Sequence, residues 1–182
     1  MPSAMGRLRA ATLAVLTLVC ALASETTVKA DEGGKCSDAQ ETYDTANGYR
    51  SLHGAPPMAW SISLAASSQA YAETLAAQGC PLIHAKPLAF GENLMQASMY
   101  VISSPKPNNL RCADAVNGWY SQVMFYNFTT PTPYWTNKGR GVFHFSQVVW
   151  RSSTAFGCGV AGQEMPVASI DVWPPQNKTG SH

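Results

Sequence analysis

Charged residues are scarce in this sequence. Only 13% of its 182 residues are Asp, Glu, Lys or Arg, and the 12 basic residues nearly balance the 11 acidic ones, for a formal net charge of +1. This balance argues against a strongly basic nucleic-acid binder, so no nucleic-acid partner is expected. A hydrophobic fraction of 46% excludes general disorder.

Long apolar runs are equally few. One prominent run covers residues 10–23, which is shorter than the ~20 residues that a bilayer span requires. Two arginines precede it, and Val28-Lys29-Ala30 after it has small residues at both positions that a signal peptidase reads, as in a secretory signal peptide. We expect residues 1–30 to be cleaved, leaving one domain over residues 31–182, secreted to the extracellular space and without a transmembrane segment. A retained N-terminal anchor is the alternative.

Cysteine is sparse, but its number is even after the predicted signal peptide. Cys36, Cys80, Cys112 and Cys158 remain, and an even count in an exported chain predicts disulfide bonds. Three pairings are open, and the sequence alone does not choose among them. No pair has the C-x-x-C spacing of a zinc knuckle.

Two N-x-S/T triplets are candidate glycosylation sites in an exported chain. They are Asn127-Phe128-Thr129 and Asn177-Lys178-Thr179. Such triplets also occur by chance, so the sequence marks Asn127 and Asn177 as candidates only.

Apolar periodicity predicts helices in the first two thirds of the chain. The patterns cover residues 43–52, 58–78 and 112–126. The predicted inner faces carry Tyr43, Ala46, Tyr49 and Leu52 in the first helix, and Trp60, Leu64, Tyr71, Ala72 and Leu75 in the second.

Strand signals come late. Residues 156–161 and 167–172 are apolar segments around a turn with Gly and Pro, which predicts a β-hairpin. Residues 80–92 and 129–141 are predicted loops, and periodicity does not decide between helix and strand for residues 143–150. Helices followed by strands indicate the α+β class.

Five short motifs follow one another in a fixed order. They are Asn47–Trp60, Cys80–His84, Gly91–Leu94, Trp119–Phe128 and His144–Ser153, the last followed by Gly157-Cys158. Together they resemble the CAP superfamily of cysteine-rich secretory, antigen 5 and pathogenesis-related proteins, and most of all its single-domain plant and fungal members. The resemblance covers about residues 40–177. It implies a three-layer α-β-α sandwich.

The resemblance also implies a cleft with two histidines and two acidic residues. The matching positions are His84, Glu92, Gln122 and His144, where Gln122 replaces the usual glutamate. Family members bind zinc or another divalent cation through the two histidines, so His84 and His144 are the expected metal ligands. Glu92 and Gln122 would hold water or orient an imidazole. We expect weak binding, because Gln122 is neutral.

The last family motif departs from the usual pattern. Ile170 stands in the place of a cysteine, and the ending is Pro174-Pro175-Gln176-Asn177. One usual disulfide partner is therefore missing, and Cys158 is expected to pair elsewhere or not at all.

Aromatic residues gather between the third predicted helix and His144. In fungal and plant relatives this loop binds sterols, so the resemblance implies a sterol or fatty-acid-like lipid as ligand. The candidate lipid-binding residues are Tyr126, Phe128, Tyr134 and Trp135. The alternative is that several of these rings pack the core, since Tyr126 follows the helical face of Trp119. A glycan at Asn127 would lie inside this segment and argue against deep lipid burial there.

The sequence thus predicts a secreted, non-enzymatic lipid-binding CAP protein. A defence or protein-interaction module recognised by a cell-surface receptor is the first alternative. A metal-dependent peptidase is the second. It is disfavoured because the sequence has neither an HExxH nor a Gly-x-Ser-x-Gly motif, and because one of two paired acids is lost.

Overall fold

A computed structural model of the chain describes residues 34–87, 89–96, 110–162 and 167–173. The predicted signal peptide and the sequon at Asn177 lie outside the described residues. The elements are, in order, α1 (Ala39–Leu52), β1 (Ala59–Trp60), α2 (Ile62–Ala77), β2 (Gly91–Gln96), α3 (Cys112–Tyr120), the 3-10 helix η1 (Ser121–Phe125), α4 (Pro133–Asn137), α5 (Phe143–Val148), β3 (Ala155–Ala161) and β4 (Val167–Trp173).

The strands form one sheet in the order β1-β3-β4-β2. β3 and β4 are antiparallel, which confirms the predicted hairpin, and β1 is parallel to β3. β2 pairs with β4 in antiparallel register, so that Glu92 lies opposite Asp171. The prediction of a loop up to residue 92 was wrong at its end, because Gly91 and Glu92 already belong to this strand.

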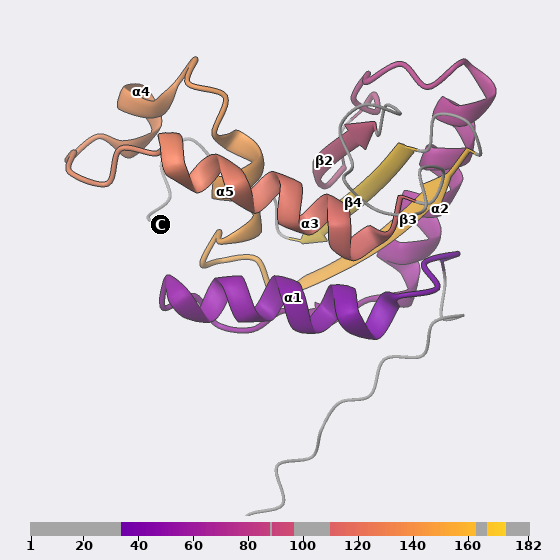
Figure 1. Ribbon diagram of the computed structural model, residues 1–182, viewed down its shortest axis with the longest axis horizontal. Helices are drawn as coiled ribbons and strands as arrows, with labels where there is room; N and C mark the ends of the chain where they lie inside the picture. Colours follow the sequence, from indigo (N-terminus) through magenta and orange to yellow (C-terminus); the bar gives the residue numbers. More distant parts are fainter. Residues whose placement is uncertain (1–33, 88, 97–109, 163–166, 174–182) are drawn as a thin grey trace, which may run out of the picture.

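Helices cover both faces of the sheet, which confirms the α+β sandwich. Figure 1 shows the strands between α2 and α3, with α1 and α3 side by side. Gly157 and Gly159 face α2, since a Cβ atom at either position would collide with the backbone of Ala65 or Gln69. Their neighbours Phe156 and Cys158 point into the core on the opposite side, together with Trp119 and Phe145 of the other helices.

The first predicted helix is confirmed as α1, but its buried face differs from the prediction. Leu52 is 71% exposed, whereas Thr42 and Arg50 are fully buried beside Ala46. Periodicity assigned the face by hydrophobicity alone. Arg50 is buried because it donates hydrogen bonds to backbone carbonyls.

The second predicted helix begins later than expected. Ala59 and Trp60 pair with β3 as the short strand β1, so Trp60 is not on the helix. Ser61 has an extended backbone and its Oγ accepts from the Leu64 N–H at 3.3 Å. A serine cap of this kind fixes the start of α2 at Ile62.

The remaining helices refine the predictions for residues 112–150. The helix predicted to reach Tyr126 ends at Tyr120 and continues as η1. The loop predicted for residues 129–141 contains the short helix α4, which starts at Pro133 as proline favours. The ambiguous segment after residue 142 is the helix α5. No helix in the described part of the chain combines the length and apolar character of a membrane span.

Only one disulfide forms among the described residues. It joins Cys36 and Cys112, both fully buried. Cys80 and Cys158 are buried thiols that lie in different hydrophobic clusters, so these two candidates do not bridge each other. Burial strongly raises the pKa of Cys158, and the charges of Asp38 and Asp171 raise it further. Its thiol stays protonated and therefore does not attack the nearby disulfide.

Candidate functional site

His84 and Glu92 form the first half of the predicted cleft. Glu92 lies on β2 with a side chain only 1% exposed, while His84 lies in the preceding loop and is half exposed. Nδ1 of His84 is 2.6 Å from Oε1 of Glu92, and the same oxygen accepts from the Ala85 N–H at 3.1 Å. The buried carboxylate therefore fixes both the loop and the orientation of the imidazole.

Gln122 and His144 form the second half. Gln122 lies on η1 and His144 on α5, and Nε2 of Gln122 is 2.7 Å from Nδ1 of His144. Asn93 donates to the His144 carbonyl at 3.0 Å, which ties α5 to β2. Burial lowers the pKa of His144, and the charge of His84 lowers it further. The structure thus brings each predicted acidic or amide position against one histidine, and the two histidines within electrostatic reach of each other.

A divalent cation would require an unprotonated ring nitrogen from each histidine. His84 fits, because a carboxylate that accepts from Nδ1–H leaves the lone pair of Nε2 available. His144 does not fit while Gln122 donates to its Nδ1. Within the described ranges, the one group of three His, Cys, Asp or Glu ligand atoms mutually within 4.8 Å is Cys36, Cys112 and Cys158. Zinc binding at the cleft stays a prediction.

The predicted lipid-binding residues lie in two aromatic groups. Tyr126 and Phe128 have ring centroids 4.8 Å apart, and both contact Phe145 edge-on. Tyr134 stacks on Phe143 at 5.6 Å and meets Trp135 edge-on at 5.0 Å. Each group therefore packs partly against α5. The expectation that some rings contribute to packing applies to Tyr126 and Tyr134.

The segment from residue 124 to residue 135 exposes large apolar side chains. Four large apolar side chains are more than half exposed there, namely Met124 (73%), Phe125 (54%), Phe128 (58%) and Trp135 (64%). Exposed apolar groups of this size that gather in one segment are typical of an interaction surface. We call these four residues the apolar loop patch.

A small cavity opens beside Phe128. It has a volume of about 140 Å³ and is lined by His53, Tyr126, Phe128, Phe145 and Val149. The volume is below the roughly 300 Å³ at which ligand pockets begin. The cavity can therefore accept part of an apolar ligand but not enclose one.

Comparison with known proteins shows the family to which the chain belongs. A family model described as the cysteine-rich secretory protein family, CAP, matches residues 43–165. The chain belongs to the CAP family. Pathogenesis-related protein 1 of Arabidopsis thaliana is 36% identical over 126 residues, covering 68% of both chains.

Solved structures agree on the fold. BmVAL-1 superposes with a TM-score of 0.64 at 22% identity, covering 82% of this chain and 83% of its own. Na-ASP-1 superposes with a TM-score of 0.63 at 16% identity, but this chain spans only 40% of Na-ASP-1. Pathogenesis-related protein 1A of Nicotiana tabacum is 31% identical over 149 residues, covering 80% of this chain and 81% of its own.

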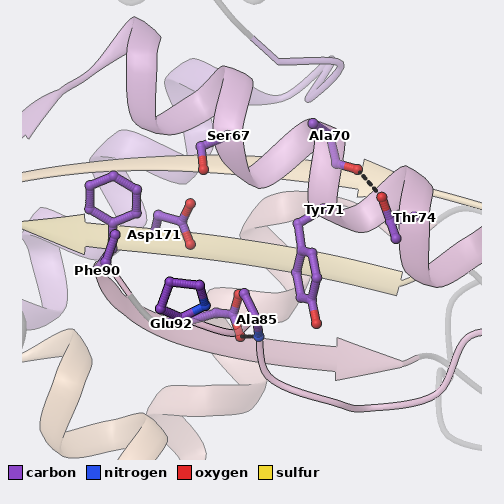
Figure 2. A pocket seen from close by; sticks show the side chains of 10 residues that line it. Ser67, Ala70, Tyr71, Thr74, Ala85, Phe90, Glu92 and Asp171 are labelled. Carbon is purple, nitrogen blue, oxygen red and sulfur yellow. Dashed lines mark hydrogen bonds between the residues drawn. The ribbon is translucent and has the colours of Figure 1, made fainter.

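A larger pocket of about 380 Å³ lies beside the cleft of this CAP domain, on the α2 side of the sheet. Figure 2 shows Ser67 and Tyr71 on α2, and Glu92 and Asp171 on the strands, around this pocket. Asp171 is only 4% exposed. The pKa of Asp171 is raised to about 6, mainly by burial and also by the charge of Glu92, while hydrogen bonds from Ser67 and Ser68 oppose the rise.

Asp171→Asn is expected to stabilise the fold at neutral pH. A carboxyl pKa above the ordinary value of 3.8 means that the folded state holds the proton more tightly, so stability falls as pH rises from about 4 to 6. A carboxyl pKa near 6 in the folded state lowers the free energy of unfolding by about 3 kcal/mol at pH values above 7. Urea unfolding should therefore show a gain of up to about 3 kcal/mol at about pH 7.5 and almost none at about pH 3.5. An equal change at both pH values would contradict this assignment.

Three residues of the two pockets and the aromatic loop were not predicted from the sequence. Asp171 lies in an apolar strand with no motif to mark it. His53 lies within the first of the five motifs without a predicted role, yet it stacks on Phe128 with centroids 5.9 Å apart and its Nε2 lies 3.1 Å from the Tyr120 hydroxyl. Asn137 is buried and forms hydrogen bonds within the aromatic loop.

The side chain of Asn137 forms three hydrogen bonds with the backbone of the aromatic loop. Its Nδ2 donates to the carbonyls of Asn127 and Pro133, each at 3.0 Å, and its Oδ1 accepts from the Asn127 N–H at 2.8 Å. The Asn127 side chain itself accepts from Thr129. A glycan on Asn127 stays a prediction.

Proposed function

We propose that this CAP protein acts outside the cell and binds a sterol or fatty-acid-like lipid at the apolar loop patch. The observation that carries the proposal is the exposure of Met124, Phe125, Phe128 and Trp135 within twelve consecutive residues. Leaving these groups in water is unfavourable, and covering each large side chain contributes about 1.5–3 kcal/mol.

The geometry suggests how a lipid would be held. Phe128 borders the small cavity, so an apolar end could enter between Phe128 and His53 while the rest lies along the exposed rings. His53 can hydrogen-bond a hydroxyl such as the one that a sterol carries, although its Nε2 already contacts Tyr120. The hydrogen bonds of Asn137 keep both aromatic groups in place without a ligand, which lowers the ordering cost of binding.

Exchanging Phe128 and Tyr134 for serine should remove lipid binding. Wild-type protein is expected to show a higher melting temperature with cholesterol present, because a ligand of the folded state stabilises it. The double variant should lose this shift and bind at least about tenfold more weakly, since two aromatic rings of the predicted lipid-binding loop are removed. Ile62→Ser is the matched control, because Ile62 is 55% exposed on α2, away from the loop.

The alternative occupant of the patch is a protein. A cell-surface receptor would be recognised through the same rings, and the pathogenesis-related relatives favour such a defence role. In that case cholesterol and fatty acids leave the melting temperature unchanged in a folded protein. A metal-dependent peptidase would instead show chelator-sensitive cleavage that His144→Ala abolishes.

A further inference from the structure

Gln122 touches both the imidazole of His144 and the start of α5. Its Oε1 lies 3.4 Å from the backbone nitrogen of Phe145, and its Nε2 lies 2.7 Å from Nδ1 of His144. Phe145 is the third residue of α5, so its N–H has no acceptor inside the helix. A backbone N–H can only donate. It therefore directs the carbonyl oxygen of Gln122 to α5 and the amide NH₂ to the imidazole.

We propose that Gln122 holds His144 in the Nε2–H tautomer and so turns the cleft away from divalent cations. An amide NH₂ can only donate, so Nδ1 of His144 must accept. A neutral imidazole with an acceptor at Nδ1 carries its proton on Nε2. The atom that would coordinate a metal ion is then an N–H group.

His84 adopts the opposite tautomer. Its Nδ1 faces a buried carboxylate, which only accepts, so the proton lies on Nδ1 and Nε2 keeps its lone pair. The cleft thus offers one acceptor, on His84, and one donor, on His144. A neutral group that both donates and accepts, such as a hydroxyl or an amide, matches this pair, and a cation does not. A glutamate at position 122 would instead accept from Nδ1–H and leave both histidines with lone pairs.

The tautomers can be read directly. Long-range ¹H–¹⁵N spectra of the secreted, ¹⁵N-labelled chain at about pH 8, above the ordinary histidine pKa, distinguish Nδ1–H from Nε2–H. The signals of His144 are identified by their loss in His144→Gln. We expect Nε2–H for His144 and Nδ1–H for His84, and we expect His144 to switch to Nδ1–H in Gln122→Glu. An Nδ1–H tautomer of His144 in the wild type would overturn the proposal, whether or not a variant folds.

Zinc titration by calorimetry, with zinc chloride as the only ligand, supplies a second readout. Gln122→Glu should bind at least about tenfold more tightly than the wild type, which is the scale of effects from groups that orient metal-binding histidines. Ser121→Glu adds the same charge at an exposed neighbour but no acceptor for Nδ1, and it should stay close to the wild type. Equal zinc affinity in the wild type and Gln122→Glu, or the full gain in Ser121→Glu, would refute the role of Gln122.

Discussion

Replacing Arg50 with methionine is expected to destabilise the fold by roughly 3–5 kcal/mol. The guanidinium is fully buried and donates to four backbone carbonyls, those of Pro56, Val148, Trp150 and Ser153, at 2.8–2.9 Å. Each acceptor that loses its donor costs about 1 kcal/mol or more. Three of these bonds join α1 to the end of α5 and the segment that follows it, so their loss should also loosen the helix that carries His144.

Equilibrium unfolding in urea measures this effect. Burial lowers the pKa of Arg50 to about 10, so the side chain remains charged at neutral pH. A change in the protonation of Arg50 therefore does not contribute to the difference between wild type and variant. Arg151→Met is the matched control, because Arg151 is exposed and a surface change of this kind stays within about 0.5 kcal/mol. A loss below about 1 kcal/mol in Arg50→Met would show that these hydrogen bonds do not stabilise the fold as argued.

Removing the Cys36–Cys112 disulfide should be about as costly. The bond closes a loop with a sequence separation of 76 residues, and the loop-entropy relation gives about 4.5 kcal/mol for a loop of this length. The double variant with alanine at both positions should therefore unfold at a clearly lower urea concentration. The structural reason is that the bond joins the segment before α1 to the first residue of α3.

Cys158→Ala separates the cross-link from the loss of buried sulfur. Cys158 is fully buried within 4.8 Å of the bonded pair but is not cross-linked. Its replacement should cost about 1 kcal/mol, as an ordinary core truncation does. If Cys158→Ala were as damaging as the double variant, packing rather than the cross-link would account for the stability.

The fold was largely predictable because its motifs and periodicities are strong. The hairpin of β3 and β4 follows from alternating apolar segments around a turn, and α1 follows from its helical spacing. β2 was missed, since Gly91–Gln96 has no alternating pattern and becomes a strand only by pairing with β4. Leu52 was predicted to be buried but is exposed, and Arg50 is buried in α1 although the pattern did not predict it, because hydrophobicity carries no information on which carbonyls need a donor.

The candidate site was predictable in part. The motifs that resemble the CAP family named His84, Glu92, Gln122 and His144, and the structure brings them together as two pairs. The direction of the hydrogen bond from Gln122 depends on the backbone N–H of Phe145, which only the folded chain reveals.

The roles of Asp171 and Asn137 also depend on contacts that only the folded chain forms. Asp171 enters the pocket through strand register alone. Asn137 acts through backbone carbonyls of its own loop. Neither role leaves a mark in composition or spacing.

Direct sterol binding by the purified, secreted chain tests the central claim. Labelled cholesterol would be competed with unlabelled cholesterol and ergosterol, with and without a divalent cation. We predict saturable binding in the submicromolar-to-micromolar range that is lost when Phe128 and Tyr134 become serine. Absence of saturable binding by a chain shown to be folded by circular dichroism would contradict the lipid-binding function and assign the apolar loop patch to a protein partner.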